Sequence, residues 1–178
     1  MQATAPYAPS LSIRPIEPED LNLLYTIEND PELWHCSTSD ALYSRFALRQ
    51  YLSSLRPVAE MQELRMVVET TADAIVTPVG LAELTNIDLA NARAEVGIAL
   101  LRKHRGHGFG TRALLLLERI ARERLHLHQL YALVSVHNAV AINAFTHGGY
   151  GEVATLPQWH RTAEGYQDVK VLQKILEK

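Results

Sequence analysis

A basic, glycine-rich turn constrains this sequence more than any other segment. Three glycines alternate with other residues over residues 105–110, between an apolar strand-like run and an amphipathic helix. Glycine lets main-chain N–H groups approach a ligand without interference from a Cβ atom. The start of a helix adds unpaired N–H donors and the positive end of the helix dipole. We therefore expect residues 105–111, here called the phosphate loop, to bind a pyrophosphate, with Arg102, Lys103 and Arg105 adding positive charge around it.

Several kinds of glycine-rich loop compete for this segment. The nucleoside-triphosphatase loop requires GxxxxGK[ST], a string that the sequence lacks. The Rossmann turn requires GxGxxG/A, which residues 108–113 match, but the next strand-like run, residues 130–137, lacks the acidic residue that would hold a ribose. Residues 105–110 also match a third pattern, [QR]xxGx[GA]. A turn whose glycines only permit a sharp change of direction is the remaining, purely structural interpretation.

Composition is that of a globular protein. The chain has 178 residues, enough for one domain, and its 47% hydrophobic and 21% charged residues argue against disorder. A net charge of −3 gives no support for nucleic-acid binding, and no apolar run approaches the ~20 residues of a membrane span. Cys36 is the single cysteine, which excludes an intrachain disulfide. Residues 1–9 lack the features of a signal peptide and are expected to form a loose tail, so we expect a cytoplasmic protein.

Hydrophobic periodicity predicts an α/β chain. We expect strands at residues 10–16, 64–70, 75–86, 92–100, 130–136, 150–156 and 166–175, and helices at residues 18–29, 39–55, 111–125 and 138–145. This order, β-α-α-β-β-β-α-β-α-β-β, predicts a mixed central β-sheet flanked by helices, in a single domain over residues 10–178.

Two of these helices have a clear amphipathic pattern. The helix at residues 39–55 is expected to bury one apolar stripe, made of Leu42, Phe46, Ala47, Leu52 and Leu55. The helix at residues 111–125 is expected to bury another, made of Ala113, Leu117, Ile120, Ala121 and Leu125. On its opposite face we expect two i,i+4 ion pairs, Glu118–Arg122 and Arg119–Glu123.

A second motif follows the phosphate loop at a distance that allows one helix and one strand. Residues 138–150 read NAVAINAFTHGGY, which resembles NxxAxxx[YF]xxxG[FY], a motif of the GNAT N-acetyltransferases. The pyrophosphate loop of that family carries the pattern [QR]xxGx[GA]. Residues 13–21, 80–84 and 93–98 resemble the spermidine/diamine-type and ribosomal-protein-type branches of the family, and the similarity extends over roughly residues 10–176.

The resemblance implies a GNAT-like fold, acetyl-CoA as cofactor and direct transfer of an acetyl group to an amine. Main-chain groups of Ile98, Ala99 and Leu100 would hold the pantetheine arm, as an added strand would. Amides of the phosphate loop would hold the pyrophosphate: Arg105, Gly106, His107, Gly108, Phe109, Gly110 and Thr111. Asn138 would contact the cofactor beyond the thioester, unless it serves solely as a helix N-cap, and the Phe145 ring would pack near the sulfur.

Two questions about catalysis stay open at this level. Glu83 is our first candidate for the base that deprotonates the amine, against a purely structural carboxylate paired with an arginine; the rival bases are Glu95, Glu28, Glu32 and His137. Many GNAT members carry tyrosine where this chain has Phe145, and phenylalanine cannot give a proton to the leaving thiolate. A thiol with a pKa of about 8.5 is nevertheless a fair leaving group at pH 7.

The expected partners follow from the same reasoning. The acceptor is expected to be a polyamine, a small-molecule amine or a protein N-terminus, with no nucleic acid, no membrane and no metal, and the chain is a candidate homodimer. The acidic residues Glu28, Asp30 and Glu32 would either attract a cationic acceptor or simply be solvated at a helix end. The competing function is a catalytically weak or inactive GNAT-fold module that binds acyl-CoA or a peptide.

Overall fold

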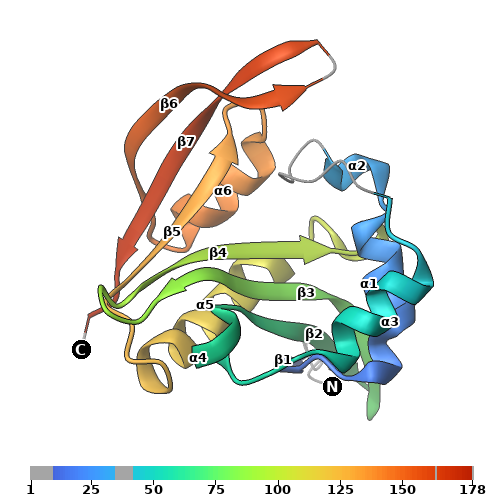
Figure 1. Cartoon of the computed structure of the whole chain (residues 1–178). Coiled ribbons are helices and arrows are strands. Elements are labelled where there is room, and N and C mark those ends of the chain that lie inside the picture. The colour runs from blue at the N-terminus through green and yellow to red at the C-terminus, as the bar shows by residue number, and fades with distance from the viewer. Residues whose placement is uncertain (1–9, 35–41, 163, 178) are drawn as a thin grey trace, which may run out of the picture.

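In the computed structural model, which describes residues 10–34, 42–162 and 164–177, seven strands form one mixed sheet (Figure 1). Their order across the sheet is β1-β2-β3-β4-β5-β7-β6. The strands are β1 (Ser10–Pro15), β2 (Leu64–Ala72), β3 (Ile75–Asp88), β4 (Arg93–Leu100), β5 (Gln129–Ser135), β6 (Gly151–Thr162) and β7 (Gly165–Ile175). The predicted strands and the mixed sheet are therefore confirmed. The predicted tail at residues 1–9, Cys36 and the predicted helix start at residues 39–41 lie outside the described residues.

The sheet opens in its middle, between β4 and β5. These two strands are parallel and pair over a short register, from Arg93↔Gln129 to Glu95↔Tyr131. All other neighbouring strands are antiparallel. Beyond Glu95 the two strands diverge, so that β4 stays with β3 while β5 turns away with β7 and β6 (Figure 1). The facing edges of residues 96–100 and 132–135 are consequently left without a partner strand.

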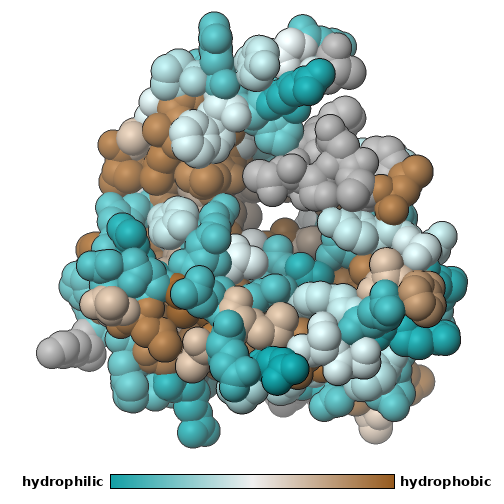
Figure 2. Space-filling model, viewed as in Figure 1, coloured by the Kyte–Doolittle hydropathy of each residue, from teal (hydrophilic) through white to brown (hydrophobic). Residues whose placement is uncertain are grey.

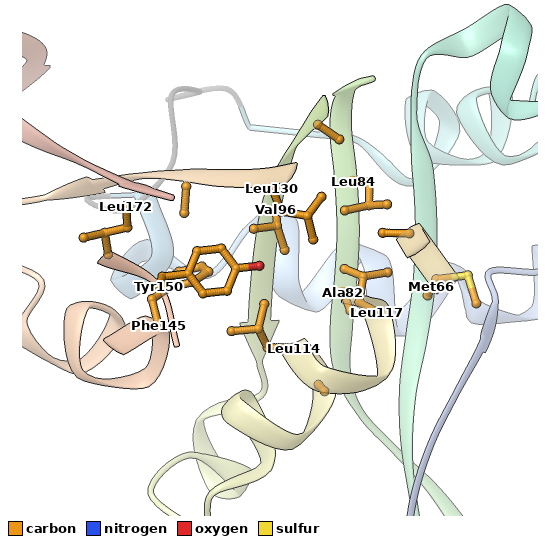
Figure 3. Packing of buried hydrophobic residues seen from close by; sticks show 14 of the residues in the cluster. Met66, Ala82, Leu84, Val96, Leu114, Leu117, Leu130, Phe145, Tyr150 and Leu172 are labelled. Atoms are coloured by element: carbon orange, nitrogen blue, oxygen red, sulfur yellow. The ribbon is translucent and has the colours of Figure 1, made fainter. Parts of the chain in front are cut away.

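Helices cover both faces of the sheet, as the alternation of side chains along a strand requires. They are α1 (Leu21–Glu28), α2 (Pro31–Trp34), α3 (Arg45–Ser53), α4 (Val58–Met61), α5 (Phe109–Glu123) and α6 (Ala139–His147), with short 3-10 turns at Pro18–Asp20 and Arg102–His104. On β2, Val67 packs in the cluster under α1 and α3, whereas Met66 and Val68 pack in the cluster that holds α5 and α6 (Figure 3). None of the helices in the described part of the chain is long and apolar enough to cross a membrane.

The predicted faces of two helices need correction. Helix α3 begins at Arg45, because the Ser44 hydroxyl caps it by accepting the Ala47 amide. It buries Leu48 and, as predicted, Leu52. The prediction is wrong for Leu42 and Phe46, which are 75% and 68% exposed, whereas Leu55 packs against the same cluster as Leu48 and Leu52. Ala47 is also exposed and Leu55 is half-buried. Docking against α1 selects the face that carries Leu48 and Leu52.

Helix α5 begins two residues before its predicted start and buries Ala113, Leu117 and Ala121 as predicted. The predicted pair Glu118–Arg122 is wrong: Glu118 is buried and binds Lys174, while Arg122 pairs with Glu123. The buried face of α5 is wider than the apolar stripe suggests, because β7 lies close enough to supply a cation to the carboxylate. The second predicted pair, Arg119–Glu123, is also wrong, because Glu123 pairs with the adjacent Arg122.

Asp20 joins β1 to the first helix through a buried carboxylate. Its two oxygens accept hydrogen bonds from the Arg14 guanidinium at 2.7 and 2.8 Å and from the Glu17 amide at 2.8 Å. These hydrogen bonds, chiefly those from Arg14, hold the pKa of Asp20 below its usual range.

We expect Asp20→Asn to lower the free energy of unfolding by about 2 kcal/mol, the order of a hydrogen bond to a charged group. Because the pKa of Asp20 is lowered in the folded state, its contribution is complete above the ordinary aspartate pKa and is lost as the pH falls through the lowered value. Urea unfolding of both proteins between pH 3 and pH 7 should thus show a difference that shrinks in acid. Asp73→Asn, in the exposed β2–β3 turn, is the control, and an equal loss in both variants would contradict the assignment.

Candidate functional site

A cavity of about 200 Å³ lies where β4 and β5 diverge. In the space-filling view the surface is hollowed between these two parts of the sheet (Figure 2). Its walls come from both diverging strands, from α6 and from the α1 side of the sheet: Val96, Gly97, Ile98 and Ala99; Ala132, Leu133, Val134 and Ser135; Asn138, Ala141 and Phe145; and Ile27, Glu28, Leu33, Leu81 and Glu83. The structure therefore brings the predicted residues Glu83, Ile98, Ala99, Asn138 and Phe145 to one cavity.

The phosphate loop presents a run of open amides at the start of α5. The Arg105 amide donates to the Arg102 carbonyl, and the Arg112 amide donates to the Gly108 carbonyl in the first turn of the helix. Between these two bonds, the amides of residues 106–111 have no hydrogen-bond acceptor within the described chain. Gly106 and Gly108 have φ angles of +79° and +74°, and a Cβ atom at either would meet nothing within 4 Å. Such a concave run of N–H donors at a helix N-terminus fits an anion.

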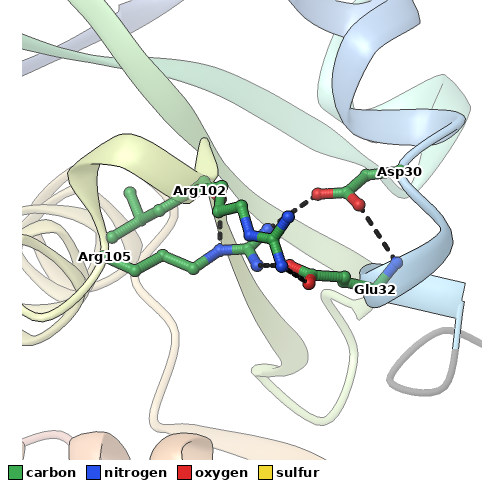
Figure 4. Close-up of polar contacts among 5 residues, drawn as sticks. Asp30, Glu32, Arg102 and Arg105 are labelled. Atoms are coloured by element: carbon green, nitrogen blue, oxygen red, sulfur yellow. Dashed lines mark hydrogen bonds and ion pairs between the residues drawn. The ribbon is translucent and has the colours of Figure 1, made fainter.

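The Arg105 side chain is engaged with the α1–α2 segment. Its Nε donates to the Leu100 carbonyl at 2.9 Å, and its two terminal nitrogens bind Asp30 at 2.9 Å and Glu32 at 3.0 Å (Figure 4). Arg102 also pairs with Glu32. We call these four charged side chains the arginine clasp. Asp30 and Glu32 are thus neither simply solvated nor unpaired, and much of the positive charge expected around the loop is already compensated.

A second set of charges, which we call the acidic cluster, lies at the α1 side of the cavity. Arg65 of β2 binds Glu28 at 2.6 Å, Glu83 at 2.8 Å and Glu63 at 3.4 Å. The Tyr51 hydroxyl donates to Glu63 at 2.6 Å, and the Arg65 guanidinium lies over the Tyr51 ring. Among the described residues, three carboxyl groups therefore share the single guanidinium of Arg65, so these four side chains together carry more acidic than basic groups.

Glu83 has the arginine partner expected of a structural carboxylate and the position required of a candidate base. It is a carboxylate paired with Arg65, and it also lines the cavity. It faces Gly97 across the β3–β4 pair, where a Cβ atom would approach Glu83 Oε1 to 3.0 Å, so glycine leaves room for the carboxylate. Burial, together with Glu28 and Glu63, raises the pKa of Glu83, although Arg65 opposes the shift. A carboxylate with a raised pKa accepts a proton more readily than an ordinary glutamate.

Of the rival bases, Glu28 shares the position of Glu83 at the cavity, and the other three do not line it. Glu28 lines the cavity beside Glu83, but Glu32 belongs to the arginine clasp. Glu95 accepts a hydrogen bond from Asn86, and neither Glu95 nor His137 lines the cavity. Among the described residues no His, Cys, Asp and Glu side chains gather in a group that could hold a metal ion.

The α6 side of the cavity holds the remaining predicted residues. The Asn138 side chain accepts the Ala141 amide at 3.0 Å, so its interpretation as an N-cap is confirmed, and the residue lines the cavity as well. Phe145 is 7% exposed and packs edge to face against Tyr150, with ring centroids 5.1 Å apart. The Tyr150 hydroxyl is buried, and Tyr150 does not line the cavity.

Sequence reasoning missed Arg65, Tyr51 and Glu63, as well as the arginine clasp. Arg65 meets Glu28 and Glu83 from segments distant in the chain, and no local pattern signals such contacts. The sequence pattern predicts a strand at residues 132–135 but does not indicate that this strand forms a wall of the site. The position of this strand directly before Asn138 was the available signal.

Comparisons with known proteins agree with this geometry. The model of the acetyltransferase (GNAT) domain matches residues 10–150. Spermidine N(1)-acetyltransferase of Escherichia coli strain K12 is 30% identical over 147 residues, which cover 82% of this chain and 75% of that protein. The crystal structure of spermidine N-acetyltransferase from Vibrio cholerae in complex with CoA and spermine superposes with a TM-score of 0.85 at 25% identity, covering 93% of this chain and 95% of that one.

A dodecameric structure of the Vibrio cholerae enzyme superposes with a TM-score of 0.79 at 25% identity, over 93% of this chain and 94% of that one. The family model spans most of the present chain, and the divergence of β4 and β5, the open phosphate loop and the α6 residues all lie within it. The chain belongs to the GNAT acetyltransferase family and is an acetyl-CoA-dependent N-acetyltransferase.

Proposed function

We propose that this enzyme acetylates a polyamine such as spermidine or spermine, and that the acceptor enters the cavity from the side of the acidic cluster. The observation that carries the proposal is the excess of carboxylates over guanidinium groups around Arg65, since Glu28 and Glu83 both line the cavity. A cation with several ammonium groups is attracted to such a site. The names of the relatives in Escherichia coli and Vibrio cholerae support the same substrate class.

The amine must lose a proton before it can react. An alkyl ammonium group with a pKa of about 10.4 is neutral in roughly one molecule in 2500 at pH 7. In our proposal Glu83 accepts that proton, because it lines the cavity and its pKa is raised. Arg65 orients the carboxylate at 2.8 Å, and Glu28 keeps the surroundings negative.

The residues present fit acetyl-CoA, which supplies the acetyl group as an activated thioester. The open amides of residues 106–111 would hold the pyrophosphate. Arg105 leaves the predicted group of pyrophosphate-binding residues, because its amide and its side chain both donate hydrogen bonds within the protein. Main-chain groups of Ile98, Ala99 and Leu100 lie on the edge of β4 that lacks a partner strand, where they would hold the pantetheine arm. Asn138 and Phe145 would border the thioester end.

The same edge of β4 supplies donors for the developing negative charge. A main-chain N–H near residues 98–100 is fixed by the β3–β4 pairing and needs no rearrangement to stabilise an oxyanion. Phe145 cannot protonate the departing sulfur, so that proton comes from water or another polar group in our proposal. The thiol, with a pKa of about 8.5, needs little assistance to leave at neutral pH.

We also propose that the domain includes β6 and β7, beyond the residues that the family model matches, and that the chain forms at least a homodimer. Both strands belong to the same sheet as β5, which supports their inclusion. The dodecameric assembly of the Vibrio cholerae relative supports self-association. On the β6–β7 hairpin, Trp159 and Tyr166 are 58% and 66% exposed, as side chains at an interface would be in an isolated chain.

A panel of amines tests the substrate class. We expect kcat/KM for spermidine and spermine to exceed that for a peptide with a free N-terminus by about tenfold or more, equivalent to ~1.4 kcal/mol of added attraction. We also expect KM for the polyamines to rise with ionic strength, because salt screens the acidic cluster. Faster turnover of the peptide would reassign the acceptor. Binding of acetyl-CoA without turnover of any amine would instead support the inactive module.

Replacing Glu83 tests the proposed base. We expect Glu83→Gln to reduce kcat/KM by ~10²–10⁴-fold above the raised pKa of Glu83, where the unmodified enzyme has the base as a carboxylate, and to differ less from it at lower pH. In the unmodified enzyme the rate should fall as the pH drops through the raised pKa of Glu83, because the base acts as a carboxylate. The control is Glu63→Gln, which changes the acidic cluster without touching the cavity wall.

In Glu63→Gln the loss of a nearby negative charge should lower the pKa of Glu83. The pH–rate profile of this variant should therefore begin to fall at a lower pH than that of the unmodified enzyme, while the maximal rate is retained. If the pH–rate profile of Glu83→Gln superposed on that of the unmodified enzyme, Glu83 would have a purely structural role.

Replacing Gly108 tests the phosphate loop. We expect Gly108→Ala to weaken acetyl-CoA binding at least ~tenfold, because a Cβ atom enters the space above the open amides and the φ of +74° is strained for alanine. Gly165→Ala is the matched control, since Gly165 also has a positive φ and open surroundings but lies at the β6–β7 turn. Calorimetry that finds equal affinities in the two folded variants would place the pyrophosphate elsewhere.

A further inference from the structure

A partly buried ion pair joins three elements outside the cavity between β4 and β5. Lys174 of β7 donates from its Nζ atom to Glu118 Oε2 of α5 at 2.6 Å and to the Gly148 carbonyl at 2.7 Å. Gly148 is the C-cap residue of α6, and Glu118 is 8% exposed. Neither Lys174 nor Glu118 lines the cavity between β4 and β5. The pair therefore connects β7, α5 and the end of α6 without lining the cavity.

The end of α6 carries this connection to Phe145. Gly149 has a φ of +88°, and the Tyr150 amide donates to the Phe145 carbonyl at 3.0 Å, which closes the helix. The Tyr150 ring then folds back against the Phe145 ring (Figure 3). Lys174 Nζ lies 5.7 Å from the centre of the Tyr150 ring. One ammonium group thus contacts both the last turn of α6 and the ring that supports Phe145.

The Tyr150 hydroxyl belongs to the same group of buried polar atoms. Tyr150 Oη and Glu118 Oε1 are buried, and neither makes a regular hydrogen bond within the described residues. Burial, and secondly the nearby Glu118 carboxylate, raise the pKa of Tyr150 well above its usual range. The phenol consequently keeps its proton and can orient it toward the carboxylate.

Helix α6 depends more than α5 on its contact with Lys174. Of the residues of α6, all described by the structure, Phe145 alone is buried. Helix α5 is anchored by several buried apolar side chains, namely Phe109, Ala113, Leu114, Leu117 and Ala121. An element with few buried apolar contacts shifts more easily. Loss of the Lys174 hydrogen bond should therefore move α6 while the phosphate loop at the start of α5 stays in place.

We propose that Lys174 and Glu118 are positioning residues for acetyl transfer: Lys174, held by Glu118, fixes the last turn of α6 and thereby sets the Phe145 ring against the thioester arm. The inference rests on the proposed placement of that arm beside Phe145. It separates two functions of the cofactor site, because α5 holds the phosphate end and α6 borders the thioester end.

Three variants test this role. Lys174→Met removes the ammonium group but leaves Glu118 buried without its cation. The double variant Glu118→Leu, Lys174→Met removes both charges, so it avoids an unpaired buried charge that could prevent folding, yet it still lacks the donor to Gly148. The control is Lys170→Met, four residues earlier on the same face of β7, which breaks a 2.6 Å pair with Glu152. Each protein is compared by kcat, KM and calorimetric binding of two ligands, acetyl-CoA and adenosine 3′-phosphate 5′-diphosphate.

We expect Lys174→Met and the double variant to bind the adenosine fragment like the unmodified enzyme, because the phosphate loop is intact. Their affinity for acetyl-CoA should fall about tenfold and kcat by roughly 10–100-fold, the order expected for a misplaced reacting group. Lys170→Met should change none of these values.

Unchanged kcat and acetyl-CoA affinity in the folded double variant would overturn the proposal, whether or not Lys174→Met folds. Equal weakening of both ligands would also overturn it, because the effect would then reach the phosphate loop. If the unmodified enzyme bound acetyl-CoA no more tightly than the adenosine fragment, the thioester arm would add no affinity. The proposed placement of that arm beside Phe145 would then be wrong.

Discussion

Parallel pairing between β4 and β5 stops after Glu95 and Tyr131, and every part of the candidate site depends on this divergence. Two strands that stayed paired would satisfy each other's main-chain groups and leave no space between them. Because they separate, the β4 edge can pair with an extended ligand, and the cavity opens between Gly97 and the α6 residues. The antiparallel partners β3 and β7 keep each diverging strand in place on its other side.

Arginine side chains organise the charged groups around this opening. Arg105 ties the phosphate loop to Asp30 and Glu32, and Arg65 gathers the carboxylates beside the cavity. The two groups have opposite consequences. In the arginine clasp the charges are balanced, so in our proposal binding of an anionic cofactor relies on open amides and the start of α5. In the acidic cluster, as far as the structure describes it, one guanidinium is paired with three carboxyl groups, and this surplus of acidic groups is the basis of our proposal that the acceptor is cationic.

The sequence predicts the local structure at both ends of the candidate site, because each end is formed by one short motif. The glycines of the phosphate loop start α5 at Phe109, and Asn138 caps α6, so spacing along the chain suffices to place them. Spacing fails for Glu118, whose i,i+4 neighbour Arg122 suggested a surface pair. Its partner is Lys174, 56 residues later in the sequence. Whether Glu118 pairs with Arg122 or with Lys174 depends on how β7 packs against α5, which the sequence spacing does not indicate.

The sequence by itself determined the order of the strands and of α1, α3, α5 and α6, together with the family, because periodicity and short motifs are local properties. It missed the four-residue helices α2 and α4, which are too short to show a periodic pattern. The tertiary structure decided where β4 and β5 separate, which arginine meets which carboxylate, and which face α3 buries. These features depend on side chains from distant segments that meet after the chain has folded. Glu83 illustrates both: its strand was predictable, but Arg65 and Gly97 give the carboxylate its partner, its space and its raised pKa.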